Sequence, residues 1–201
     1  DANIILNTLT KGATLKRGTL ISSESFVLGH SSEYPYLTNF NKNALEKIHI
    51  LNPGDIIKQD EFMIKALKTK HNDPTTIGFG IHLPNLNISY TSDTSFFQGL
   101  VTEHKDADIL IANNVNPYEE PIAHNLNTSD TINLISEINP KLTILQHFGE
   151  SLLNKNPVYE ARLVKQKTNQ QVISAYDNLS IDPSSYSVSS PQKSIFSFNK
   201  S

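Results

Sequence analysis

The chain has 201 residues, of which 37% are hydrophobic and 18% are charged, and it carries a formal net charge of −3 at pH 7. This size and composition are those of one ordinary globular domain. The slight acidic excess provides no general basic field, which argues against non-specific binding to nucleic acids. Cysteine is absent, which excludes disulfides, thiolate metal ligands and a cysteine nucleophile, and suits a reducing cytoplasm. No run of about 18 apolar residues could span a membrane, and the residues that follow Asp1 show no signal peptide.

The first part of the chain predicts short elements. Residues 2–9 place apolar side chains at helical spacing, and Gly12 follows as a suitable stop. Residues 17–22 are predicted to form a short strand, after which Ser23 could cap a short helix. The polar segment 29–43 is predicted to be a loop.

The middle of the chain is rich in predicted strands. A turn at residues 53–55 comes before an alternating, half-buried strand at residues 62–67. Residues 77–83 and 86–90 are separated by only two residues, which predicts a hairpin. Residues 108–112 form a continuous apolar run, which is typical of a strand covered on both faces.

Helices and strands alternate in the last third. Residues 127–138 predict an amphipathic helix with Asn127 or Thr128 as its N-cap. A buried strand is predicted at residues 142–146, followed by a helix at residues 157–167. Strands that alternate with helices favour a layered α/β domain.

The C-terminal segment differs in composition from the rest. A last strand is predicted at residues 171–176, and from Asp182 onward the sequence is rich in serine. We therefore expect a domain of residues 1–182 and a tail of residues 183–201 without a regular core element. Deletion of this tail is expected to change the free energy of unfolding little.

Three side chains of metal-ligand type stand just beyond the carboxyl ends of predicted strands: His71, Asp93 and His147. Loops at the carboxyl ends of strands are where α/β sheets build their sites, and imidazoles with a carboxylate suit zinc or iron. Each residue alone has another explanation. Asp93 could cap a following short helix, His147 could satisfy a buried carbonyl, and His71 could lie on the surface.

The surrounding residues carry a family resemblance. In chain order they read HNDP, GFGI, ISYTSDT, ADILIAN, HNLNT and PKLTILQHFG. This order resembles metallo-β-lactamase-fold hydrolases, especially the ribonuclease Z-like and archaeal metal-dependent hydrolase branches, over about residues 1–178. The resemblance implies an α/β fold that is a four-layer αββα sandwich. It also implies that His71, Asp93 and His147 hold two divalent metal ions, with Asp93 bridging them and His124 near the leaving group. The metal is expected to be zinc, with iron or manganese as alternatives.

The chain departs from this family at one motif. The H-x-H-x-D-H loop, which supplies four metal ligands in the family, occurs nowhere in the sequence. We expect this loop and the N-terminal portion of the sandwich to lie upstream of Asp1, and the alternative is a degenerate member that has lost its metal. The site in this chain should then be open and bind metal weakly. A sheet face should be exposed unless an upstream segment or another chain covers it.

The resemblance implies a metal-dependent hydrolase in which a metal-bound hydroxide attacks an ester, a lactone or a phosphodiester. Only 21 residues separate His71 from Asp93, which leaves little room for a tRNA-gripping arm, and the chain is slightly acidic, so tRNA is disfavoured. Two alternatives remain open at this point: a metal-free module that binds a partner, and a di-iron oxidoreductase on the same fold.

Overall fold

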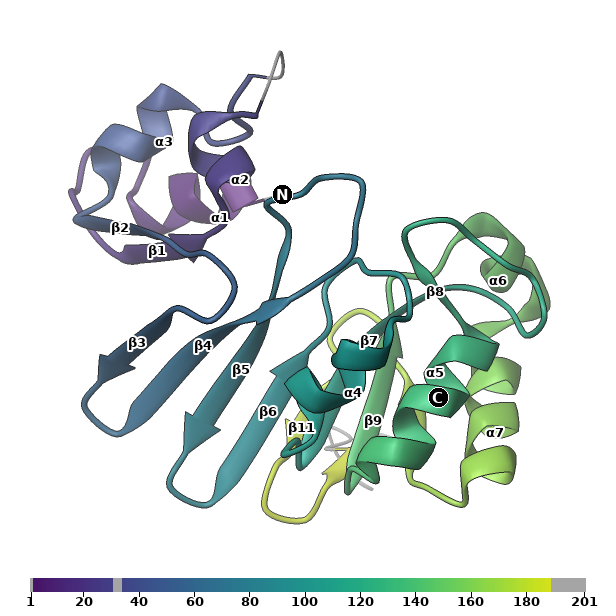
Figure 1. Ribbon diagram of the computed structural model, residues 1–201. Helices are drawn as coiled ribbons and strands as arrows, with labels where there is room; N and C mark the ends of the chain where they lie inside the picture. The colour runs from purple at the N-terminus through teal and green to yellow at the C-terminus, as the bar shows by residue number, and fades with distance from the viewer. Residues whose placement is uncertain (1, 31–33, 189–201) are drawn as a thin grey trace, which may run out of the picture.

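A computed structural model describes residues 2–30 and 34–188 (Figure 1). The elements, in chain order, are α1 (Ala2–Leu9), β1 (Thr19–Ser22), α2 (Glu24–Leu28), α3 (Asn39–Ala44), β2 (Lys47–Ile50), β3 (Ile56–Gln59), β4 (Phe62–Lys68), β5 (Ile77–Leu83), β6 (Leu86–Tyr90), α4 (Gln98–His104), β7 (Ile109–Asn116), β8 (Leu126–Asn127), α5 (Thr128–Ile138), β9 (Leu142–Gln146), α6 (Glu150–Lys155), α7 (Pro157–Thr168), β10 (Val172–Ser174), β11 (Ile181–Asp182) and β12 (Ser187–Val188).

One eight-stranded mixed sheet organises the chain. Its strand order is β10-β9-β7-β6-β5-β4-β3, and β8 pairs with the end of β7. The strands β3 to β6 are antiparallel to their neighbours, whereas β6, β7, β9 and β10 run parallel. The strands β4, β6, β7 and β9 consequently share one direction, so the loops that follow them leave the same edge of the sheet. We call this edge the carboxyl edge.

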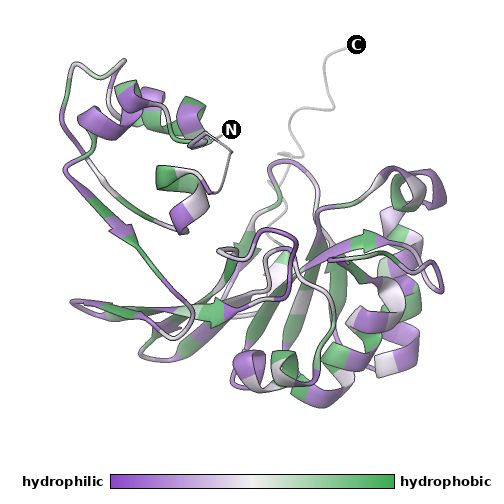
Figure 2. Ribbon diagram, turned by 45° about the horizontal axis from the view of Figure 1, so that its top comes forward, coloured by the Kyte–Doolittle hydropathy of each residue, from purple (hydrophilic) through white to green (hydrophobic). Residues whose placement is uncertain are grey.

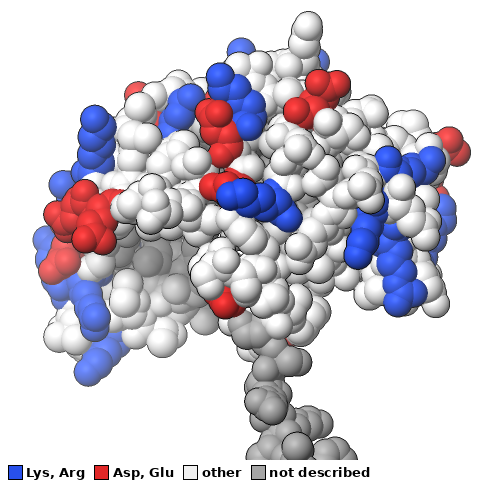
Figure 3. Space-filling view, turned by 90° about the horizontal axis from the view of Figure 1, so that it is seen from below, with Lys and Arg blue, Asp and Glu red and all other residues white. Residues whose placement is uncertain are grey.

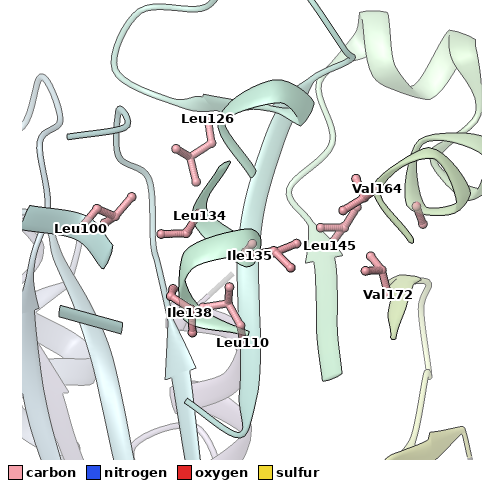
Figure 4. Packing of buried hydrophobic residues seen from close by; sticks show 11 residues of the cluster. Leu100, Leu110, Leu126, Leu134, Ile135, Ile138, Leu145, Val164 and Val172 are labelled. Carbon is pink, nitrogen blue, oxygen red and sulfur yellow. The ribbon is translucent and has the colours of Figure 1, made fainter. Parts of the chain in front are cut away.

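The main core lies between the parallel half of the sheet and the helices α4, α5 and α7. Figure 4 shows the side chains of this core meeting from both layers. Its buried members are Leu100, Leu110, Ala112, Leu126, Leu134, Ile135, Ile138, Leu145, Ala161, Val164 and Val172. The helix α5 begins with a capping box, in which the Asn127 side chain accepts from Asp130 N and the Asp130 side chain accepts from Asn127 N.

The opposite face of the sheet is unevenly covered, because Ile109 and Leu142 are buried there but the next residues along that face are not. Side chains alternate between the faces of a strand, so Ile111, which follows the buried Leu110, points away from the helices. Its neighbour across the sheet is Ile144 of β9, and both side chains are only half-buried. The α/β class is therefore confirmed, with a helical layer on one face of the large sheet.

Residues 2–30 and 34–50 form a small lobe beside the large sheet (Figure 2). The parallel pair β1–β2 packs with α1 to α3 around Leu6, Val27, Leu37 and Leu45. Ser25 of this lobe donates its hydroxyl to Asp73 Oδ2 at 2.6 Å. Burial would raise the pKa of Asp73, but hydrogen bonds from Ser25 and Thr75 outweigh this effect and hold the pKa below its ordinary value. The lobe is thus tied to the loop between β4 and β5.

Most of the predicted strands and helices are confirmed, and one prediction needs correction. The segment 29–43 is not entirely a loop, because α3 begins within it at Asn39. Thr38 caps α3 through a bond from Asn41 N, and Asn41 Nδ2 donates to Asn3 of α1. These contacts are distant in sequence and leave no hydrophobic periodicity, so they could not be seen beforehand. The short elements β3, α4, β8 and α6 were not predicted either.

A small hairpin spans the predicted boundary between domain and tail, with β11 at the end of the predicted domain and β12 in the tail. Both strands are short and mostly exposed, and Gln171 Nε2 donates to Tyr186 O to hold the hairpin against the domain. The rest of the tail, residues 189–201, lies outside the described residues, so the expected effect of its deletion remains a prediction.

Charged side chains of both signs are interspersed on the face seen in Figure 3. None of the helices in residues 2–30 and 34–188 is long and apolar enough to cross a membrane.

Candidate functional site

The predicted site residues all lie at the carboxyl edge of the sheet. His71 lies in the loop after β4, Asp93 in the loop after β6, and His147 directly after β9. His124 lies in the connection from β7 to β8. These four loops leave strands of common direction, which is why residues from distant parts of the sequence meet here.

Asp93 and His147 form the central contact of the site. Asp93 Oδ1 lies 3.6 Å from His147 Nε2, and both side chains reach solvent, with exposed fractions of 30% and 52%. Asp93 Oδ1 also accepts from Asn113 Nδ2 at 2.7 Å. Asn113 therefore holds the pair from the side of the sheet, and the other side of the pair is open to solvent.

His71 lies beside His124. The two imidazole centroids are 6.4 Å apart, and the rings meet edge to face. His71 Nδ1 accepts from Asp73 N at 3.3 Å and lies 3.4 Å from Thr76 Oγ1. Nδ1 is thus engaged with its own loop, and Nε2 is the nitrogen left to meet a ligand.

Two hydrogen bonds, one to a side chain and one between backbones, join the loop of His71 to the loop of Asp93. Lys70 N donates to Thr94 Oγ1 at 2.9 Å, and Ser95 N donates to Lys70 O at 2.8 Å. The two loops are therefore fixed relative to one another, although the side chains of His71 and Asp93 are not recorded in contact.

Four residues of the site loops have left-handed backbones. Ser92 has a φ of 57°, Glu119 of 60°, His124 of 64° and His147 of 60°. Residues with a Cβ rarely adopt this conformation, because the side chain crowds the following carbonyl. Strain of this kind tends to be retained where it aims side chains at a functional site.

Beneath Asp93 the backbones approach closely. A Cβ on Gly78 of β5 would lie 2.6 Å from Tyr90 O and 3.0 Å from Thr91 O. Only glycine allows β5 to pass so near the end of β6, where the Asp93 loop begins.

The structure brings the predicted residues together as two pairs, Asp93 with His147 and His71 with His124. Within the described part of the chain, no group of three or more His, Asp or Glu side chains is close enough to hold a metal ion. The full convergence of His71, Asp93 and His147 therefore stays a prediction.

The structure also bears on the simpler explanations of these residues. Asp93 does not cap a helix, because α4 begins five residues later with Phe97 as its N-cap. His147 is exposed, and its recorded contact is to Asp93 and not to a buried carbonyl. His71 is half-buried and bonded within its loop.

The donor set suits a divalent metal ion. Imidazole nitrogens and a carboxylate are ligands of zinc, iron and manganese. The open side of the Asp93–His147 pair and the free Nε2 of His71 leave three such atoms available at one edge. The residues present therefore fit a metal ion, as part of a ligand set that others would complete.

Two residues that support the site were not predicted. Asn113 is 2% exposed and binds Asp93, and Gln146 Nε2 in turn donates to Asn113 Oδ1 at 3.1 Å. The available signal was a polar pair, Asn113-Asn114, that ends an apolar strand. A separate cavity of about 390 Å³ lies away from these residues, between α4 and the strands β4 to β6.

Comparison with known proteins identifies the family. The family described as beta-lactamase superfamily domain matches residues 6–148. MJ1374, an uncharacterized protein of Methanocaldococcus jannaschii, is 38% identical over 185 residues, which are 90% of this chain and 68% of MJ1374.

Solved structures of the metallo-β-lactamase fold are also similar. YhfI from Bacillus subtilis has a TM-score of 0.66 at 16% identity, over 86% of this chain and 68% of YhfI. Zn²⁺-bound PqqB from Methylobacterium extorquens has a TM-score of 0.63 at 13% identity, over 87% of this chain and 65% of PqqB. The sequence matches show the family, and the structures show the expected fold. This chain belongs to the metallo-β-lactamase superfamily.

Proposed function

We propose that the protein is a metal-dependent hydrolase acting on an ester, a lactone or a phosphodiester. The observation that carries the proposal is the contact between Asp93 and His147, with the pair of His71 and His124 in the adjoining loops of the same edge. A superfamily of hydrolytic metalloenzymes supports the reaction class.

His71, Asp93 and His147 would hold the metal, which we propose to be two zinc ions, or iron or manganese in their place. A bound metal ion would lower the pKa of a water molecule that it binds and would polarise an oxygen of the substrate. Zn²⁺-bound PqqB, which has the same fold, supports zinc as the first choice.

Residues of the chain would orient the attacking water and protonate the leaving group. The Asp93 carboxylate would orient the attacking water, since it is held on one side by Asn113. His124 would give a proton from a ring nitrogen to the departing oxygen, a role that contributes roughly 10²–10⁴ in rate. Its imidazole is exposed and beside His71, which supports this assignment.

We further propose that an N-terminal segment or another chain supplies the remaining ligands and covers the half-buried face around Ile111 and Ile144. The supporting observation is that the described residues of the site provide fewer ligands than a closed metal centre needs. We also propose that the protein belongs to the ribonuclease Z-like branch of the superfamily and lies in the cytoplasm.

A small substrate is preferred to tRNA. The connection from His71 to Asp93 consists of β5, β6 and their short turns, with no projecting arm. The phosphodiester class is the first to test, because it is the class with a reaction at phosphorus. A diphosphatase of the PhnP family, which by its name also reacts at phosphorus, shares the fold, with a TM-score of 0.56 at 13% identity over 86% of this chain and 61% of that one.

The test measures hydrolysis of bis(4-nitrophenyl) phosphate, 4-nitrophenyl acetate and a simple lactone, by the chain alone and by the chain extended with the proposed N-terminal segment. We expect little stable zinc in the chain alone. We expect metal-dependent turnover in the extended protein, lost with a chelator and regained with zinc.

Variants of the extended protein assign the roles. Asp93→Ala should lose both metal and activity, whereas His124→Ala should keep metal and lose about two orders of magnitude in kcat. His49→Ala, a histidine of β2 outside the site, is the matched control and should change neither. Chelator-resistant zinc in the chain alone would contradict the proposed missing ligands, and metal-free turnover would contradict the reaction class.

A further inference from the structure

Asn113 occupies the junction between the sheet and the candidate site. It lies on β7, and its backbone N donates to Thr91 Oγ1 at 3.0 Å, in the loop that carries Asp93. Its side chain is buried and makes three further bonds, each to a residue of a neighbouring strand or loop. Nδ2 donates to Asp93 Oδ1 at 2.7 Å and to Tyr90 Oη at 3.2 Å, while Oδ1 accepts from Gln146 Nε2.

These partners fix the orientation of the Asn113 amide. An ionised carboxylate only accepts hydrogen bonds, so the NH₂ group of Asn113 must face Asp93. The carbonyl oxygen then faces Gln146, whose NH₂ group is the matching donor. A reversed amide would place an oxygen against the Asp93 carboxylate and an NH₂ group against that of Gln146.

The result is an asymmetric carboxylate. Asp93 Oδ1 carries the bond from Asn113 and the contact with His147. Within residues 2–30 and 34–188, no hydrogen bond to Asp93 Oδ2 is found. One oxygen is therefore anchored to the sheet, and the other remains available to a ligand.

We propose that Asn113 is a positioning residue that holds Asp93 Oδ1 and presents Oδ2 to the metal, with Gln146 fixing the Asn113 amide. This role rests on the proposed function, because it concerns the same carboxylate. It explains why the apolar first half of β7 is followed by a buried amide at this position. Hydrogen-bond partners of metal ligands commonly set the orientation of those ligands, and their loss weakens metal binding.

The neighbouring Asn114 provides a matched control. It is also fully buried and fully bonded, but it faces the other side of β7. Asn114 Nδ2 donates to Thr128 Oγ1 at 3.0 Å, and its Oδ1 accepts from Thr131 Oγ1 at 2.6 Å. Its Nδ2 also lies 3.4 Å from Asn116 O of β7, so its partners belong to α5 and to its own strand and not to the site.

The first test is a double-mutant cycle on the full chain without metal. Urea unfolding is measured for Asn113→Ala, Asp93→Ala and the double variant, and the coupling is read as a ratio of unfolding constants. We expect a coupling of about fivefold or more, and less than about twofold for Asn114→Ala with Asp93→Ala. If Asn113→Ala fails to fold, the half-buried Gln146→Met replaces it, with a smaller coupling of the same sign. If neither the cycle with Asn113→Ala nor the cycle with Gln146→Met shows coupling to Asp93→Ala, the inference is overturned.

The second test measures Zn²⁺ affinity by competition with a chromophoric chelator, in the extended protein. We expect Asn113→Ala to bind zinc about 10- to 100-fold more weakly, and Asn114→Ala to match the wild type within about twofold. Equal affinities for both variants overturn the positioning role. If the wild type binds no zinc, the proposed function fails, and the metal-presenting role fails with it. The coupling between Asn113→Ala and Asp93→Ala, measured by urea unfolding without metal, then shows separately whether Asn113 holds Asp93.

Discussion

The two halves of the large sheet are built differently. In the parallel half, Leu110, Leu142 and Leu145 are completely buried. In the antiparallel half, Ile64 is only half-buried, and Ile56 at the edge strand β3 is 50% exposed. Asp93 follows β6, the strand where the halves meet. The parallel half therefore supports the site with the large main core, whereas the antiparallel half contributes loops and a smaller buried cluster around Ala66 and Ile77.

The largest expected effect tests this difference in density with two leucines on strands. Leu145→Ala in β9 removes a completely buried side chain of the main core and should cost about 3–4 kcal/mol of the free energy of unfolding. Leu86→Ala in β6 removes a half-buried side chain and should cost about 1 kcal/mol. Urea unfolding of both variants measures the difference, and equal costs would contradict the comparison.

The next effect concerns His104 of α4, which contacts β6, the strand where the two halves of the sheet meet. Its Nδ1 pairs with Ser89 Oγ of β6, and its Nε2 has no partner among the described residues. Burial lowers the pKa of His104 to about 4 from 6.5. The unfolded chain therefore binds a proton between these values that the folded chain does not, and stability falls as the pH falls from 6.5 to 4. The loss is roughly 3 kcal/mol at most.

The variant His104→Asn isolates this contribution. It should be less stable at neutral pH, but its stability should depend much less on pH between 6.5 and 4. Carboxylates with lowered pKa values, such as Asp73 and Asp108, remain in both proteins and titrate in the more acidic range. Urea unfolding across the pH range compares the two, and parallel pH profiles would show that His104 is not the responsible group.

The smallest effect extends the comparison to the N-terminal lobe. Ser25→Ala removes a hydrogen bond to the Asp73 carboxylate and should cost about 1–2 kcal/mol. Hydrogen exchange should rise in the lobe and in the loop of His71, while the main core remains protected. Ser23→Ala is the control, because the Ser23 hydroxyl has a 3.4 Å contact with Ser25 and no bond to Asp73. Faster exchange throughout the parallel half would show that the lobe is not a separate unit.

The parts of the fold that could be predicted from sequence are those with strong local patterns. The apolar runs of β7 and β9 and the alternating pattern of β4 identified strands, and Asn127 identified the start of α5. The helix α3 and the strand β3 were missed, because their stability comes from tertiary contacts and pairing with distant residues.

The site could be predicted only in outline. Strand ends placed His71, Asp93 and His147 at one edge, since the direction of parallel strands follows from the alternation of helices and strands. The pairing of His71 with His124 and the support of Asp93 by Asn113 depend on side-chain directions. The left-handed backbones of His124 and His147 determine part of these directions. No sequence pattern predicts that a histidine will have a positive φ.

The carboxyl edge carries every candidate site residue, whereas the main core lies below it, against the helices. The connection from β7 to β8, which includes His124, is exposed or half-buried after Pro117 and ends at the fully buried Leu126. Such a loop can lengthen, shorten or change its side chains without repacking the sheet. The same scaffold could therefore be altered toward new substrates through this loop. Gly78 would remain fixed, because the backbone beneath Asp93 leaves no room for a side chain there.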